Sequence, residues 1–82
     1  MRDDEQRIID HLVYHVVVHH PEWKTDIQNA MKDCDTKLAK FQAGREPAKK
    51  HIWKAIRETK DPYGKWVVDS AADSLIFKAM RG

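Results

Sequence analysis

Apolar residues recur along most of the chain at the spacing of an α-helix. Near the N-terminus they form a broad stripe of paired positions, which consists of Ile8, Ile9, Leu12, Val13, Val16 and Val17. Side chains three and four residues apart share one helix face. The stripe therefore predicts a first helix that begins near Asp3 or Asp4, where acids favour the positive end of the helix dipole. The β-branched run Val16–Val18 lowers helix propensity and leaves a strand as an alternative there.

A second helical pattern begins at Pro21, because proline fits the first turn of a helix. Apolar residues then recur at intervals of 4, 4, 3, 4 and 3, at Trp23, Ile27, Met31, Cys34, Leu38 and Phe41. The spacing predicts either one long helix that ends at a Gly44 C-cap, or two helices separated near Asp33–Thr36, where N-cap residue types occur. The pattern does not decide between them.

The segment Pro47–Thr59, which follows a short connector at Arg45–Pro47, has one apolar face and one basic face. Its apolar side holds Ala48, Ile52, Ala55, Ile56 and Thr59, and its opposite side holds Lys50, Lys54 and Arg57. We predict a helix that buries the first face and presents the second to solvent. The helix should end by Asp61–Gly64, a sequence typical of a turn.

The C-terminal part predicts a short strand and a last helix. Lys65–Val68 is rich in β-branched and aromatic residues, and Asp69 or Ser70 can cap a helix whose apolar side holds Ala71, Ala72, Leu75, Ile76, Ala79 and Met80. A β-hairpin that pairs residues 65–68 with 74–77 is the alternative, but the spacing favours the helix. The expected fold is mainly α with a minor β part: three to four helices in one domain, residues 1–82, with a short strand or minimal wing near residues 64–68.

Composition narrows the class of protein. With 41% hydrophobic and 34% charged residues and only three Gly and three Pro, the chain is typical of a helix-rich globule. A single cysteine, Cys34, allows no internal disulfide, and neither a secretory signal nor a membrane-spanning apolar run is present. We expect a cytoplasmic, intracellular protein without membrane contact, in which Cys34 is a small buried hydrophobe. With no Gly-rich phosphate loop and no nucleophile motif, neither enzymatic activity nor a cofactor is predicted.

Charge is distributed unevenly between the two halves. Residues 1–40 hold six bases and eight acids, whereas residues 41–82 hold nine bases and five acids, giving −2 and +4. Seven of the fifteen Lys and Arg residues lie between Arg45 and Lys65. Cations on one helix face can neutralise phosphates and release counterions, which is the sequence-independent source of nucleic-acid affinity. The predicted nucleic-acid-binding residues are Lys49, Lys50, Lys54, Arg57, Lys60 and Lys65.

The order of basic helix, turn, tryptophan-containing strand and capped helix resembles the second half of a winged helix-turn-helix domain. In many such domains the strand after the wing reads aromatic-x-aliphatic-Thr, followed by a Gly and an aliphatic residue in the last helix; the corresponding positions here are Trp66, Val68, Asp69, Ala72 and Leu75. Asp69 and Ala72 depart from the usual threonine and glycine, and the resemblance covers Thr36–Met80. It implies that residues 47–59 form a recognition helix and that Lys60, Tyr63 and Lys65 belong to the wing.

These observations predict a small DNA-binding, transcription-regulatory module that acts on double-stranded DNA, as a homodimer or as an accessory to transcription. The alternative is a non-enzymatic adaptor or inhibitor, such as a small viral or host regulator, that binds an acidic protein through the same surface. The predicted partner-contact residues are Trp53, Arg45 and Tyr63.

A row of histidines lies along the first predicted helix. His11, His15 and His19 follow one another at i, i+4 spacing, and His20 is adjacent. Imidazoles one turn apart can chelate a transition metal. Because no carboxylate or cysteine stands at ligand spacing on the same helix, a pH-sensitive edge is favoured over a metal site, and no metal is predicted.

Overall fold

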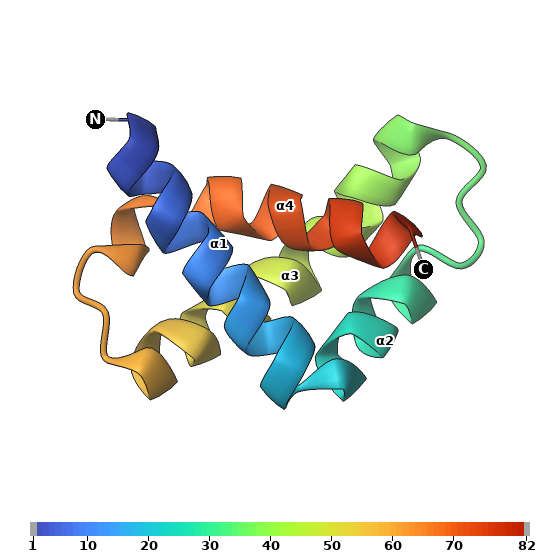
Figure 1. Ribbon diagram of the computed structural model, residues 1–82. Helices are drawn as coiled ribbons and strands as arrows, with labels where there is room; N and C mark the ends of the chain where they lie inside the picture. Colours follow the sequence, from blue (N-terminus) through green and yellow to red (C-terminus); the bar gives the residue numbers. More distant parts are fainter. Residues whose placement is uncertain (1, 82) are drawn as a thin grey trace.

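Four α-helices pack around one core in the computed structural model, which describes residues 2–81 (Figure 1). The elements are α1 (Arg2–His19), α2 (Pro21–Ala30), α3 (Lys37–Thr59), the 3₁₀ turn η1 (Gly64–Trp66) and α4 (Val68–Arg81). The predicted helical class is confirmed. None of the helices in this range is long and apolar enough to cross a membrane.

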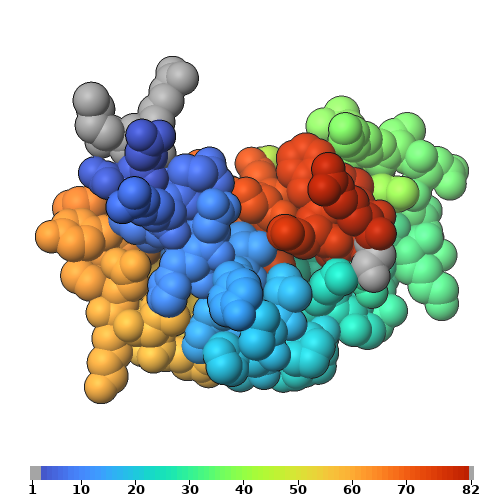
Figure 2. Space-filling view, in the orientation of Figure 1, coloured from blue at the N-terminus to red at the C-terminus, as the bar shows by residue number. Residues whose placement is uncertain are grey.

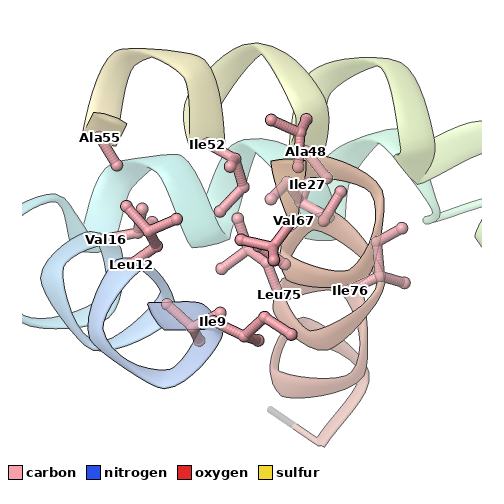
Figure 3. Packing of buried hydrophobic residues seen from close by; sticks show 14 of the residues in the cluster. Ile9, Leu12, Val16, Ile27, Ala48, Ile52, Ala55, Val67, Leu75 and Ile76 are labelled. Atoms are coloured by element: carbon pink, nitrogen blue, oxygen red, sulfur yellow. The ribbon is translucent and has the colours of Figure 1, made fainter. Parts of the chain in front are cut away.

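The core is built from the apolar stripes of all four helices (Figure 3). Its largest fully buried side chains are Leu12, Val16, Ile27, Ile52, Leu75 and Ile76. The expected apolar face of the basic segment is also buried, since Ala48 and Ala55 have no exposed surface. Because Val16 lies inside α1, the strand alternative at residues 16–18 is wrong; burial against the other helices outweighs the low helix propensity of the β-branched run.

The second apolar pattern forms two helices rather than one. α2 ends at Ala30, and α3 begins at Lys37. Thr36 is the N-cap of α3, because its hydroxyl accepts a hydrogen bond from the Ala39 N–H at 3.1 Å. Because the loop separates the two helices, the apolar positions before it and after it no longer lie on one continuous helix face. Leu38 is consequently 69% exposed and Cys34 is only half-buried in the loop, so their expected core positions were wrong.

Helix α3 continues through the connector expected at Arg45–Pro47, and the predicted helix end at Gly44 was wrong. Gly44 is buried inside the helix, where an added Cβ would lie 3.3 Å from both Cγ and Sδ of Met31. Gly44 therefore lies at the contact between α3 and the end of α2, against the flexible Met31 side chain, and not at a C-cap. Packing of α3 against α2 and α4 outweighs the usual tendency of proline to end a helix.

The short strand expected at Lys65–Val68 is absent from residues 2–81, which contain no strand, and the hairpin alternative was also wrong. Gly64–Trp66 form a 3₁₀ turn, and α4 begins at Val68 rather than after an Asp69 or Ser70 cap. Val67 and Val68 are buried in the core, and the backbone groups of this segment are already bonded: the Val67 N–H donates to the Gly64 carbonyl at 3.0 Å and the Val67 carbonyl accepts from the Ala71 N–H at 2.8 Å. The strand that the winged-helix resemblance implied is therefore not found in residues 2–81.

Candidate functional site

Helix α3 presents a continuous row of exposed residues, here called the α3 stripe. It consists of Glu46, Lys50, Trp53 and Arg57, each exposed and each three or four residues from the next. Residues at this spacing share one helix face. Trp53 is 43% exposed, so an indole ring lies between two cations on a solvent-facing surface. The stripe ends near Lys60, which closes α3 in a left-handed conformation with φ 57°.

The other predicted cations of α3 have internal partners. Lys49 Nζ lies 3.0 Å from a carboxylate oxygen of Asp69 on α4, and a second ion pair joins Arg45 to Asp73 at 3.5 Å. Lys54 is half-buried, with its Nζ 5.5 Å from the centre of the Trp23 ring.

The predicted ridge is therefore divided. Among the residues that the structure describes, Lys50 and Arg57 take part in no ion pair, whereas Lys54 is held against α2. The positive charges of Arg45 and Lys49 are paired with the carboxylates of Asp73 and Asp69 on α4.

The turn between α3 and α4 adds a second exposed group. Tyr63 and Trp66 are 57% and 73% exposed, with ring centroids 5.8 Å apart. Lys65 Nζ lies 5.5 Å from the centre of the Trp66 ring. Trp66 was not among the predicted contact residues. The 3₁₀ turn leaves it in solvent, whereas the next residue, Val67, is buried.

A histidine cluster lies where the end of α1, the start of α2 and the last turn of α3 meet. We define it as His15, His20 and Glu58. One carboxylate oxygen, Oε1 of Glu58, is 2.7 Å from Nε2 of His15 and 2.6 Å from Nε2 of His20. The second ring nitrogen of His20, Nδ1, is 3.3 Å from a Glu22 carboxylate oxygen. Two imidazoles therefore converge on a single oxygen.

Neighbouring aromatic rings orient this cluster. Trp23 stacks on His20, with centroids 3.7 Å apart and planes within 7°, and also stacks on His51 at 4.9 Å. His51 is buried and its Nε2 lies 2.8 Å from Oδ2 of Asp26. Pro21 at the start of α2 fixes the chain direction next to His20. The His20 ring is thus held by stacking as well as by hydrogen bonds.

The cluster shifts the protonation of its members. The hydrogen bond to Glu58 raises the pKa of His20 above its ordinary value, and desolvation opposes this effect while Glu22 adds to it. The pKa of Glu58 is lowered, first by its hydrogen bond to His15 and then by that to His20. Both shifts favour the pair of a protonated imidazole and an ionised carboxylate.

Sequence reasoning missed Glu58 in this cluster. The row His11, His15 and His19 was visible on α1, but the carboxylate lies 43 positions from His15 on another helix. No local spacing could have indicated it. His11 remains outside the cluster and lines a groove between α1 and α4. These two helices lie side by side on the face shown in Figure 2.

The chain matches no protein-family model, no curated protein and no solved structure. Its function is therefore inferred from its own residues.

Proposed function

We propose that the protein is a non-enzymatic nucleic-acid-binding module that holds the phosphate backbone of double-stranded DNA along α3. One observation carries the proposal: Lys50 and Arg57 are exposed on the α3 stripe, flank the half-exposed Trp53, and have no ion-pair partner among the described residues. Cations without an internal partner are those that can neutralise phosphates at least cost.

The spacing of the two cations suits a nucleic-acid strand. Arg57 lies seven positions after Lys50, and a rise of about 1.5 Å per residue places them about 10 Å apart along the axis. Each strand of a duplex carries one phosphate per about 3.4 Å of its axis, so a surface of this length faces more than one phosphate and both side chains can reach the same backbone. Arg57 is also a residue type that reads guanine, whereas the lysine mainly positions the protein.

The α3–α4 turn extends this surface. Lys60 follows Arg57 at the end of the helix, and the turn then exposes Tyr63, Lys65 and Trp66. In the proposal these residues contact the flanking backbone, which is the role that the winged-helix resemblance assigns to a wing. The turn fulfils that role without a strand.

The test compares two variants that lose equal charge. In the first, Lys50, Arg57 and Lys60 are replaced by alanine. In the matched control, three exposed cations outside this surface are replaced: Arg7, Lys32 and Lys78. Binding to a fluorescent random duplex is measured by anisotropy over a range of salt concentrations, with each variant checked for folding by far-UV circular dichroism.

The expected difference lies in the salt dependence. Each phosphate that a cation neutralises contributes a slope of about −0.9 to log K against log salt. Removing the three cations should therefore reduce the magnitude of the slope by about 2.7, while the control keeps the parental slope. Between about 50 and 200 mM salt, the DNA affinity of the parent should therefore fall about 40-fold more than the DNA affinity of the triple variant. Equal behaviour of the two variants, or no binding by the parent at low salt, would reject the α3 surface as a DNA contact.

A protein partner is the second candidate, and the exposed tryptophans favour it. Trp53 and Trp66 lie beside cations, and Trp and Arg are enriched among residues that dominate protein interfaces. In this case the acidic partner would replace the phosphate backbone. A parent protein that ignores duplex DNA but captures a partner from nuclease-treated extract, with capture lost on replacing Trp53 by alanine, would favour this function.

A further inference from the structure

We propose that His15, His20 and Glu58 form a binding site for a divalent transition metal, with Zn²⁺ as the representative ion. The inference goes beyond nucleic-acid contact and does not depend on it. The three side chains offer Nε2, Nε2 and a carboxylate oxygen, and these ligand atoms all lie within 4.8 Å of one another.

The ligand atoms lie close enough together for small side-chain movements to make room for an ion. Zn²⁺ bonds of about 2.0–2.1 Å in a tetrahedral site place ligand atoms about 3.3 Å apart. The carboxylate oxygen now lies 2.7 and 2.6 Å from the two nitrogens, so each would lengthen by less than about 1 Å when the ion replaces the shared protons. Rotation of exposed or half-exposed side chains supplies such a movement, since the Glu58 side chain is 43% exposed.

The ligand types select the class of ion. Two imidazoles and one carboxylate are a set that suits Zn²⁺ and related ions, whereas Mg²⁺ and Ca²⁺ prefer oxygen ligands alone. Three protein ligands leave the fourth position to water. The 19% and 22% exposure of the two histidine side chains leaves the site open to solvent.

The surroundings of His20 provide an independent indication. Metal-binding histidines usually donate their second ring N–H to a carboxylate, which fixes the tautomer and the ring orientation. Nδ1 of His20 faces the Glu22 carboxylate at 3.3 Å, and Trp23 stacks on the ring. This leaves Nε2 to face the ion. The metal would join three segments that the chain otherwise holds together by hydrogen bonds.

The site is tested with untagged protein, because a histidine tag would bind the same ions. Titration with Zn²⁺ is followed by calorimetry, and Co²⁺ reports the coordination geometry through its visible absorption. The variants are His20→Ala and Glu58→Gln. The control is His11→Ala, which removes an exposed histidine from the same histidine row on α1 but outside the cluster.

We expect one equivalent of Zn²⁺ to bind the parent and the control alike, and each cluster variant to bind at least tenfold more weakly. Glu22→Gln should weaken binding about tenfold or more, through the orientation of His20. A parent without saturable binding, a control as impaired as His20→Ala, or a Glu58→Gln variant that binds like the parent would overturn the proposal.

A measurement on the unmodified protein covers the case in which a variant fails to fold. Zn²⁺ should shift the imidazole NMR signals of His15 and His20 together, at a single equivalent. Shifts confined to His11 and His15, or to His15 and His19, would show that an i, i+4 pair on α1 binds the ion without Glu58, and would equally overturn the site proposed here.

Discussion

Gly64 is the position where a single added methyl group should most clearly disturb this fold. It is buried in the turn that ends the α3 surface, and a Cβ built there would lie 2.7 Å from Cγ1 of Ile56 and 3.2 Å from Cδ1 of Leu12. Carbon atoms pack best at about 3.5–4.0 Å. The change Gly64→Ala therefore forces an overlap approaching about 1 Å with core side chains that have little room to move.

The magnitude follows from two opposing effects. Overpacking of a core costs about 1–3 kcal/mol, and the reduced freedom of the unfolded chain returns about 0.4–1 kcal/mol. We expect Gly64→Ala to lower the free energy of unfolding by about 1–2 kcal/mol. At about 4–8 °C per kcal/mol for a domain of this size, the melting temperature should fall by about 5–15 °C.

Gly44→Ala is the matched control, because it adds the same methyl group to another buried glycine. There the nearest atoms, at 3.3 Å, belong to the flexible side chain of Met31, and the position lies inside α3. Alanine improves helix propensity by about 1 kcal/mol, so this variant should be as stable as the parent or more stable. Urea denaturation, followed by circular dichroism, measures the free energy of unfolding of both variants and of the parent. A Gly64→Ala variant of parental stability, or equal losses in the two variants, would refute the packing argument.

Two further predictions concern charge. The pKa of His20 is raised, so protonated His20 stabilises the folded protein fully below pH 6.5, and this contribution is lost as pH rises through the raised pKa. The pKa of Glu58 is lowered, so ionised Glu58 stabilises the folded protein above pH 4.5, and this contribution is lost as pH falls through the lowered pKa. The stability advantage of the parent over Glu58→Gln should thus be largest between pH 4.5 and 6.5, and denaturation curves showing a constant advantage up to about pH 9 would contradict this. Replacing Asp69 and Asp73 by asparagine should release the two cations that they pair with on α3, steepening the salt dependence of DNA binding by up to about 2 while costing less than about 1 kcal/mol per exposed pair. Anisotropy titrations check the slope, and an unchanged slope would place those cations outside the contact.

The sequence by itself determined the helical class and the faces that the helices bury, but not where α2, α3 and α4 begin and end. Apolar residues at i, i+3 and i+4 require only the geometry of one helix, so the stripes of α1 and α4 and the buried side of α3 could be predicted without tertiary information. The exposed positions of Lys50 and Arg57 follow from the same periodicity, since a helix that buries Ile52 and Ala55 turns the opposite side outward.

Only the tertiary structure decided which charges are free and which groups meet. Asp69 and Asp73 pair with cations of α3 because α4 packs along that helix, and Glu58 meets the histidines because α3 ends beside the junction of α1 and α2. Packing also overrode local signals at Pro47, which stays inside α3, and at Val67, which enters the core instead of a strand. Contacts between residues distant along the chain depend on how helices pack, and no short-range pattern records that.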